Sequence, residues 1–310
     1  MSTRDQRRRR FASHQAKHRR RRRLAFAALI VAVAVPTLAL TAFRGSGSSE
    51  ASSGGTFGGG KTAAPRHTAG RTLARAARQQ AAIKRLLRLR LPVYCAGGKG
   101  NYVALTFDDG PSVHTPQFLD ALRDAGAHAT FFIVGGNMVS PEFASYARAD
   151  TKLGALGDHT WSHANLVALP ESQAVSEIGR AKRAIVDATH APVQLFRPPY
   201  AARNAAIARI AASFGLVQIL WNVDSRDWTG QSADKTANIV LAGLKPGAII
   251  LMHDTRVNSV SALRDMILPV LKVRGLRAVS LPELFALDPP SEAQLRDDAA
   301  RGGCSRGQSG

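Results

Sequence analysis

The sequence predicts an α/β fold, a distorted parallel (β/α) barrel of seven or eight units preceded by an apolar N-terminal helix. From residue 102 onward, short apolar runs alternate with helical segments, and the runs are apolar throughout, as in strands covered on both faces. Seven such units in about 180–190 residues suit a small closed or nearly closed barrel. An open doubly wound sheet is the alternative, but no GxGxxG or GxxxxGK[ST] motif follows the first strand, which disfavours a nucleotide site.

The expected elements alternate regularly along the chain. The expected strands are 102–107, 129–134, 155–158, 193–196, 216–223, 248–252 and 276–280. The expected helices are 115–126, 140–148, 169–190, 204–215, 233–244 and 258–274. Gly215 marks the end of one of these helices, because glycine readily takes the left-handed conformation that closes a helix. The series predicts one catalytic domain over residues 100–286, followed by a C-terminal tail over 287–310.

The charge of the chain is concentrated in its first third. The chain has 42 Lys+Arg, 22 Asp+Glu and a formal net charge of +20, but residues 1–100 hold 22 of the basic and only two of the acidic residues. Residues 101–310 are therefore neutral. No aromatic residue is interleaved with the basic residues of 73–90, as nucleic-acid binding by stacking would favour. We therefore expect no nucleic-acid partner.

The basic N-terminus is followed by a stretch long enough to cross a membrane. Residues 24–43 carry no charge and follow an arginine-rich segment; as a helix they would span about 30 Å, the thickness of a bilayer core. The positive charges predict a cytoplasmic segment over 1–23, a transmembrane signal-anchor over 24–43 and an extracellular catalytic domain. A cleaved signal peptide, with a site near Thr37-Leu38-Ala39, is the alternative. The neutral block is exported in either case.

Residues 44–99 are expected to form a flexible basic linker. Residues 44–72 are rich in Gly and Ser, and 73–90 are helix-prone and rich in Ala, Arg and Leu. We expect 73–90 to be a solvated basic stalk; a helix lying on anionic lipid or wall polymer is the alternative. Cys95 and Cys304 flank the neutral block, and an exported domain favours a disulfide between them.

Polar residues follow the expected strands at their C-terminal ends. They are Asp108-Asp109-Gly110, Asp158-His159 with His163, Arg197-Pro198-Pro199-Tyr200, Asp224 with Asp227-Trp228, and His253-Asp254. In (β/α) barrels these strand ends meet on one face, which carries the active site. Five separate segments are therefore expected to contribute to one site.

His159 and His163 are spaced so that both imidazoles can share one cation on a helical turn. A carboxylate from Asp108 or Asp109 would complete a set of two histidines and one carboxylate, with positions left for water and substrate. Its neighbour would then be free to take a proton from water. Residues 108–111 can also be interpreted as a simple Asp-Gly-Pro turn. The histidines and His253 favour the catalytic interpretation.

Five motifs, in order and spacing, resemble those of the polysaccharide deacetylases, carbohydrate esterase family 4, also described as the NodB homology domain. They are TFDDGP (106–111), HTWSH (159–163), RPPY (197–200), DSRDW (224–228) and LMHD (251–254). The resemblance covers about residues 100–286. It implies a divalent metal, usually zinc with cobalt or another ion possible, bound by Asp109, His159 and His163.

The resemblance also implies the roles of the other site residues. Asp108 matches the general base, and Arg197 matches the residue that pairs with it. The backbone N–H of Tyr200 would stabilise the oxyanion, while His253 matches the general acid.

Two further positions complete the implied site. Asp227 matches the carboxylate that orients the general acid. Trp228 and Leu251 match the walls of the pocket for the acetyl methyl group, although both could be ordinary core residues. Asp224 and Asp254 match no defined role and are taken as supporting residues.

These features predict a monomeric hydrolase that removes N-acetyl groups from an extracellular glycan, either peptidoglycan or a chitin-like polymer of N-acetylglucosamine. An O-acetyl esterase of the xylan type would use the same machinery. A third interpretation is an inactive glycan-binding protein tethered to the membrane.

Overall fold

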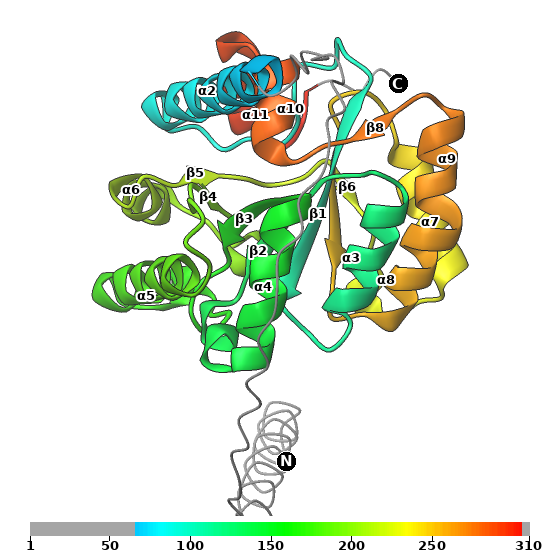
Figure 1. The fold of residues 1–310 in the computed structure, drawn as a ribbon. Coiled ribbons are helices and arrows are strands. Elements are labelled where there is room, and N and C mark those ends of the chain that lie inside the picture. Colours follow the sequence, from blue (N-terminus) through cyan, green and yellow to red (C-terminus); the bar gives the residue numbers. More distant parts are fainter. Residues whose placement is uncertain (1–65, 306–310) are drawn as a thin grey trace, which may run out of the picture. The chain divides into compact units, whose positions relative to one another are not determined.

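The computed structural model describes residues 66–305, with side-chain detail from residue 72 onward. Its sheet contains eight strands, and every pairing between them is parallel (Figure 1). The strands are β1 Tyr102–Gly110, β2 Ala129–Ile133, β3 Gly154–Asp158, β4 Leu195–Phe196, β5 Val217–Gln218, β6 Val223–Asp224, β7 Ile249–His253 and β8 Arg277–Ala278. Their order is β5-β4-β3-β2-β1-β7-β6, with β8 paired to the start of β1.

The sheet curls but does not close. β5 and β6 are its two ends, and no pairing joins them within residues 66–305. The single strand expected over 216–223 is wrong, because residues 219–222 lie between two short strands. There the backbone N–H of Ile219 donates to Phe196 O over 2.8 Å and that of Leu220 to Val93 O over 2.8 Å. The fold is therefore a curled parallel half-barrel.

Helices cover the outside of the curled sheet (Figure 1). They are α3 Thr115–Asp124, α4 Pro141–Leu153, α5 Glu171–Thr189, α6 Ala205–Ser213, α7 Ala233–Gly243, α8 Val257–Ser261 and α9 Leu268–Val273. Beneath them, Phe107 of β1 packs on Phe118 of α3 and Phe131 of β2, with ring centroids 5.0 and 5.4 Å apart. This apolar layer fixes the helices against the strands whose C-terminal ends carry the polar residues.

The helix expected over 258–274 is interrupted by a π-helical turn over Ala262–Ile267. Pro269 follows this turn near the start of α9. Proline has no backbone N–H and its ring crowds the preceding turn, so a regular α-helical ladder cannot run through this position. The expected helix therefore exists as three consecutive segments.

Three helices gather at the end of the half-barrel where the strands begin (Figure 1). They are α2 Arg66–Leu89, α10 Leu281–Leu287 and α11 Glu292–Arg301. On α2, Ile83 and Leu86 are 1% and 2% exposed. They belong to a core cluster with Ala104 and Phe132, which come from β1 and β2. The α2 helix thus closes this end of the barrel.

The structure corrects the expected boundaries of the catalytic domain. Residues 73–90 are not a solvated stalk, because α2 packs on the sheet. The expected flexible linker over 44–99 is also wrong at its end, because Val93 forms a parallel bridge with Ile219. The expected tail over 287–310 likewise contributes α11, whose Leu295 is completely buried. Arginine-rich composition masked the apolar positions of α2, whose burial is decided by tertiary packing.

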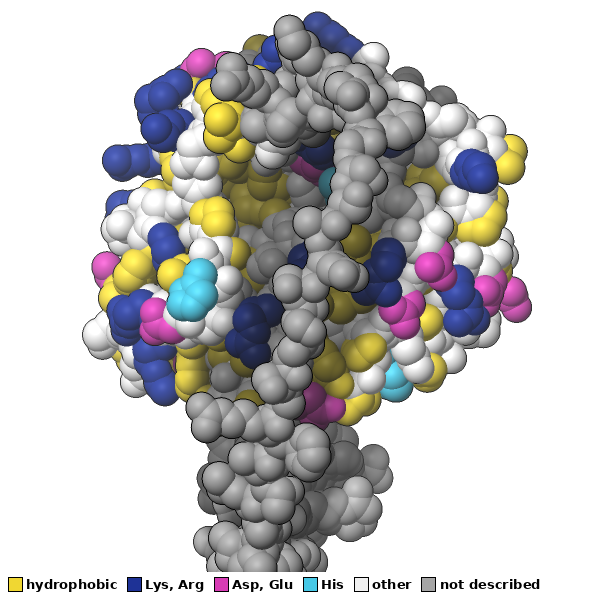
Figure 2. Space-filling model, in the orientation of Figure 1, with side chains coloured by type: hydrophobic (Ala, Val, Ile, Leu, Met, Phe, Trp, Pro, Cys, Tyr) yellow, Lys and Arg dark blue, Asp and Glu magenta, His cyan; other side chains and the backbone are white. Residues whose placement is uncertain are grey.

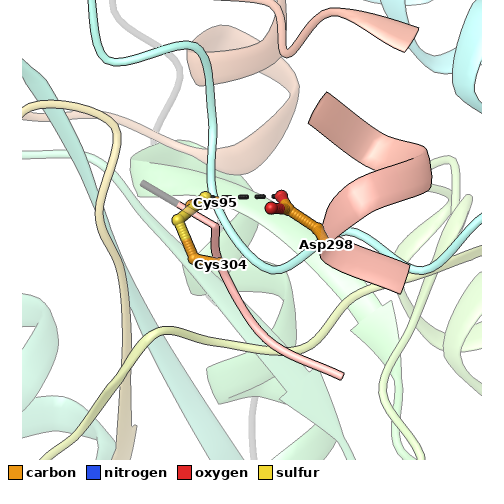
Figure 3. A group of neighbouring side chains, drawn as sticks. All are labelled: Cys95, Asp298 and Cys304. Atoms are coloured by element: carbon orange, nitrogen blue, oxygen red, sulfur yellow. Dashed lines mark hydrogen bonds between the residues drawn. A yellow bond between two sulfur atoms is a disulfide. The ribbon is translucent and has the colours of Figure 1, made fainter. Parts of the chain in front are cut away.

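Cys95 and Cys304 form a disulfide, with their Cα atoms 5.8 Å apart (Figure 3). Asp298 of α11 lies beside it, with Oδ2 3.6 Å from Cys95 Sγ. The other oxygen, Oδ1, accepts a 2.6 Å hydrogen bond from the Ser305 N–H. The bridge therefore joins the segment after α2 to the segment after α11.

Residues Thr62–Gly310 form one compact unit. The predicted cytoplasmic segment over 1–23, the predicted anchor over 24–43 and residues 44–65 of the predicted linker lie outside the described residues. Within residues 66–305, no helix combines the length and apolarity needed to cross a bilayer.

Candidate active site

The C-terminal ends of β1, β3, β4 and β7 bring the predicted polar residues together. Asp108 and Asp109 lie within the last three residues of β1, and His159 directly follows β3. Arg197 directly follows β4, and His253 is the last residue of β7. Parallel strands place these ends on one face, opposite the end that α2 closes.

Asp109, His159 and His163 form the candidate metal centre. Asp109 Oδ1 lies 3.2 Å from His163 Nε2 and 3.6 Å from His159 Nε2. Asp109 and His163 have left-handed backbones, with φ of 73° and 58°. These unusual conformations aim the side chains at one point, and each of the three residues offers a ligand atom within 4.8 Å of the others.

Neighbouring groups orient both imidazoles. His159 Nδ1 lies 2.7 Å from the carbonyl oxygen of Arg197, and His163 Nδ1 lies 3.1 Å from the Tyr200 hydroxyl. The carbonyl can only accept, so His159 carries its proton on Nδ1 and leaves the Nε2 lone pair facing Asp109. This arrangement is the usual one for a histidine that ligates a metal.

The carboxylate at this centre suits a cation. Asp109 Oδ1 is buried, and apart from the two imidazole nitrogens beside it, no described residue offers it a hydrogen bond. Burial raises the pKa of Asp109, but in the metal-free protein the hydrogen bonds and positive charge of imidazoles protonated on Nε2, those of His159 and His163, outweigh that effect and lower it. An ionised, buried oxygen beside two imidazole nitrogens fits a divalent metal ion. A second group with similar spacing, Cys95, Asp298 and Cys304, does not fit one, because its sulfurs are joined in a disulfide.

Asp108 forms a buried ion pair with Arg197. Arg197 Nη1 donates to Asp108 Oδ1 over 2.7 Å and to Thr106 Oγ1 over 2.8 Å. Arg197 is 0% exposed and Asp108 is 3% exposed. The other Asp108 oxygen, Oδ2, lies 3.7 Å from His159 Nε2. One oxygen is thus held by the guanidinium, while the other borders the metal centre.

The rest of the Arg197 side chain is also enclosed. Its Nη2 donates to Leu220 O over 3.2 Å and its Nε donates to Ile219 O over 3.4 Å. The guanidinium carbon lies 4.1 Å from the centre of the Phe132 ring. Burial lowers the pKa of Arg197, and the charge of Asp108 opposes that effect. Arg197 is therefore a fully buried member of this ion pair and not a surface residue.

His253 and Asp227 form a second charged pair on this face. His253 Nδ1 lies 2.6 Å from Asp227 Oδ1, while Asp227 Oδ2 accepts from the His253 N–H over 2.8 Å and from Ser259 Oγ over 2.5 Å. Burial lowers the pKa of His253, but the hydrogen bond and charge of Asp227 outweigh it and raise the pKa to about 9. His253 is therefore protonated at neutral pH and can donate a proton.

The predicted pocket residues lie at the rim and the wall. Tyr200 has a left-handed φ of 61° and a side chain 68% exposed, and Trp228 is 53% exposed. Leu251 is buried on β7, two residues before His253. Trp228 follows Asp227 directly, so it is not a core residue and borders the same face as the His253 pair.

The remaining acidic residues support the site from behind. Asp224 Oδ1 accepts from the Arg226 N–H over 2.9 Å and so shapes the turn before Asp227. Asp254 is 1% exposed, and its Oδ2 accepts from Thr115 Oγ1 over 2.6 Å. Burial raises the pKa of Asp254 to about 7. A side chain at Gly110 would collide with Asp254, so glycine allows the turn after Asp109 to approach it.

Sequence reasoning missed three residues that hold this site. Thr106 bonds Arg197, Ser259 bonds Asp227 and Thr115 bonds Asp254. Thr106 lies within the first motif, so a polar residue in an otherwise apolar strand was a usable signal. Ser259 and Thr115 carry no such signal, because their partners are distant in the sequence.

Comparison with known proteins agrees with this geometry. Residues 96–219 match the family model described as polysaccharide deacetylase. The chain is 36% identical over 189 residues to a peptidoglycan-N-acetylglucosamine deacetylase of Bacillus cereus, covering 59% of this chain and 68% of that protein. It is also 36% identical over 205 residues to a chitooligosaccharide deacetylase of Rhizobium leguminosarum bv. trifolii, covering 61% of this chain and 94% of that protein.

A solved structure shows the same fold. The crystal structure of the Bc1960 peptidoglycan N-acetylglucosamine deacetylase superposes with a TM-score of 0.59 at 34% identity, covering 65% of this chain and 94% of that one. Members of carbohydrate esterase family 4 are generally dependent on a divalent metal, in keeping with the donor set described above. From the shared fold, the matched motifs and these relatives, the chain belongs to the polysaccharide deacetylase family and is an enzyme of that class.

Proposed function

We propose that this enzyme removes N-acetyl groups from N-acetylglucosamine residues of an extracellular glycan, either peptidoglycan or a chitin-like polymer. The observation that carries the proposal is that two different charged pairs lie on the same face as one set of candidate metal ligands. Asp108 with Arg197 lies beside the candidate ligands, and His253 with Asp227 provides a protonated imidazole on the same face. Hydrolysis of an amide needs one group that accepts a proton and one that donates it.

Asp109, His159 and His163 would hold the divalent ion. Two imidazoles and a carboxylate suit zinc, and cobalt can occupy the same donors. When bound, such an ion polarises the acetyl carbonyl and lowers the pKa of water. Side chains and backbone groups of this chain would carry out the proton transfers and stabilise the oxyanion.

Asp108 acts as the general base. Its Oδ1 is held by Arg197, which leaves Oδ2 on the side of the metal centre to take a proton from the attacking water. The guanidinium stabilises the ionised form of Asp108, because a buried carboxylate without a partner would favour its neutral form. Arg197 is thus a positioning residue that keeps Asp108 ionised and fixed in place.

His253 acts as the general acid. Protonated through Asp227, it gives a proton to the departing amine, which would otherwise be a poor leaving group. The backbone N–H of Tyr200 donates to the oxyanion that develops on the acetyl oxygen. Trp228 and Leu251 flank the acetyl methyl group. Together these residues account for substrate binding, attack and release.

The proposal also includes the cellular setting. Residues 1–23 would lie in the cytoplasm and 24–43 would anchor the protein in the membrane, with the catalytic unit outside the cell as a monomer. This orientation is supported by the arginine block that precedes the apolar stretch. It would give the enzyme direct access to glycan beyond the membrane.

Acetate release tests the reaction. The purified catalytic unit should release acetate from N-acetylglucosamine oligomers or isolated peptidoglycan when zinc or cobalt is present, and release should stop on chelation. Acetylated xylan serves as the comparison substrate, and Asp108→Asn serves as the inactive control. Release from xylan alone would identify an O-acetyl esterase. Glycan binding without acetate release from any substrate would identify an inactive binding protein.

A further inference from the structure

The α2 helix presents two different faces. Ile83 and Leu86 point into the core cluster and are almost fully buried. The opposite face carries Arg78, Lys84, Arg85 and Arg88, with Ala74, Ala77 and Ala81 between them in steps of three or four residues. Residues so spaced lie on one side of a helix. We call the face formed by these four basic residues and the three alanines the outer face of α2.

The outer face is basic and carries no compensating acid. No Asp or Glu occurs between Glu50 and Asp108 in the sequence. Arg78, Lys84, Arg85 and Arg88 make no ion pair or side-chain hydrogen bond with residues 72–305. By contrast, Arg75, one turn earlier, contacts Glu283. Figure 2 shows Lys and Arg side chains along the upper left of the molecule, where Figure 1 places α2. Four unpaired positive charges on one rigid face favour an extended anionic partner.

The position of α2 in the chain and in the fold indicates which extended anionic partner lies nearby. The helix begins at Arg66, and only residues 44–65 separate it from the predicted membrane anchor over 24–43. Even fully extended, those residues reach at most about 75 Å. The α2 helix is therefore the first described element after the predicted anchor, and a tether of this length would hold it within about 75 Å of the bilayer. It also lies at the end of the barrel where the strands begin (Figure 1).

We propose that the outer face of α2 docks on the anionic phospholipid surface of the membrane. Lys and Arg near such a surface gain attraction from its negative potential, which decays within a Debye length. Because the strands run away from α2, docking there points Asp109 and His253, at the far strand ends, away from the bilayer. The helix would thus orient the active site toward glycan outside the membrane.

Binding to vesicles tests the docking surface. A fragment of residues 62–310 is suitable, because residues Thr62–Gly310 form a compact unit with their own core and disulfide. It should cosediment with vesicles of phosphatidylcholine and phosphatidylglycerol in a 7:3 ratio. It should not cosediment with phosphatidylcholine alone, and about 0.5 M salt should abolish binding because exposed charges are screened.

A matched pair of variants separates the outer face from net charge. The first changes Arg78, Lys84, Arg85 and Arg88 to Gln; the second changes Arg123, Arg183, Lys235 and Lys272, exposed residues on α3, α5, α7 and α9, to Gln. Both lose the same charge. At about fivefold per charge, the first should weaken vesicle binding by two orders of magnitude or more. The second should weaken it less than tenfold, and acetate release from soluble oligomers should be unchanged in the first.

Two outcomes would overturn the proposal. Equal losses in the two variants would mean that binding follows net charge alone. Binding to a soluble glycerol-phosphate polymer but not to the anionic vesicles would assign the outer face to a wall polymer instead.

Fluorescence quenching tests the proposed orientation of the catalytic unit on the membrane. With the vesicle-bound fragment, a fluorophore at Leu73→Cys should be quenched by a headgroup quencher, and one at Val139→Cys should not. Both positions are exposed, and Val139 follows β2 at the catalytic end. Equal quenching at both would contradict the orientation, whether or not the enzyme is active as proposed.

Discussion

Arg197 donates a 2.7 Å hydrogen bond to Asp108 at a place where both side chains are almost completely removed from solvent. A charge buried in this way is tolerated only with its partner, because removing one member strands the other without water. The pair is therefore expected to matter both for the stability of the fold and for catalysis.

Replacing Arg197 by Met should remove activity and lower the free energy of unfolding by about 3–5 kcal/mol, because Asp108 would then be a buried charge without a partner. Chemical denaturation and acetate release measure the two effects. The double variant Asp108→Asn/Arg197→Met should recover part of the lost stability but none of the activity. Full turnover in Arg197→Met would contradict the positioning role.

The adjacent carboxylates should separate metal binding from proton transfer. Asp109→Ala should lose both the metal and the activity, because one of three ligands is removed. Asp108→Asn should keep the metal and lose turnover, since the amide cannot accept the proton from water. Metal content after dialysis and acetate release distinguish the two variants. Retained turnover in Asp108→Asn would show that another group is the base.

His253 should titrate far above the usual range for histidine. In the metal-free protein its pKa is about 9, and Asp227→Asn should lower it, because the effect of burial is then no longer opposed by the hydrogen bond and the charge of Asp227. Nuclear magnetic resonance of the imidazole measures both values. Ser259→Ala, which removes only one bond to Asp227, is the milder control and should shift the pKa less.

The same pair predicts how stability depends on pH. The pKa of His253 is raised on folding, so its stabilising contribution is complete below about pH 6.5, the unfolded value. That contribution is lost as pH rises through about 9. The difference in unfolding free energy between the wild type and His253→Gln should therefore shrink between these values. A difference that grows with pH would contradict the pairing.

Ile83 and Leu86 should be required for the fold. Ile83→Ala or Leu86→Ala should each lower the free energy of unfolding by about 2–5 kcal/mol, as for other buried aliphatic residues. Leu73→Ala, on the same helix but 72% exposed, should change it by less than about 0.5 kcal/mol. Thermal or chemical denaturation compares the three. A chain that starts at residue 100 and remains as stable as one starting at 62 would show that α2 is dispensable.

Removing the disulfide should destabilise the protein without abolishing its chemistry. The bridge closes a sequence separation of 209 residues, and the loss of such a long constraint typically costs about 2–5 kcal/mol. Cys95→Ser/Cys304→Ser should therefore unfold at lower denaturant but release acetate normally at low temperature. Thiol titration of the unfolded wild type checks the bridge directly. Equal counts with and without reductant would rule it out.

Most of the site was predictable from local patterns. The residues at the C-terminal ends of β1, β3, β4 and β7 lie where parallel strands must place them, and this explains why Asp108, His159, Arg197 and His253 converge. Thr115 and Ser259 were not predictable, since their roles come from contacts across the fold.

The errors in the expected fold also have physical causes. The 216–223 run is apolar enough for one strand, but backbone hydrogen bonds to Phe196 and Val93 divide it. Arginine dominates the composition of α2 and favours a solvated stalk, although Ile83 and Leu86 have the three-residue spacing of a buried stripe. Burial of that stripe depends on a partner surface formed by distant strands.

The break between β5 and β6 provides the environment that Arg197 requires. In a closed barrel, the carbonyl groups of Ile219 and Leu220 would be used in hydrogen bonds to a neighbouring strand. Here they accept from the Arg197 side chain and replace the water that a guanidinium loses on burial. An unbroken sheet at this point would leave Nε and Nη2 of Arg197 without these acceptors. The gap in the sheet therefore frees two carbonyl oxygens that take the place of water around the guanidinium. They allow a permanent positive charge to be kept next to the catalytic carboxylate.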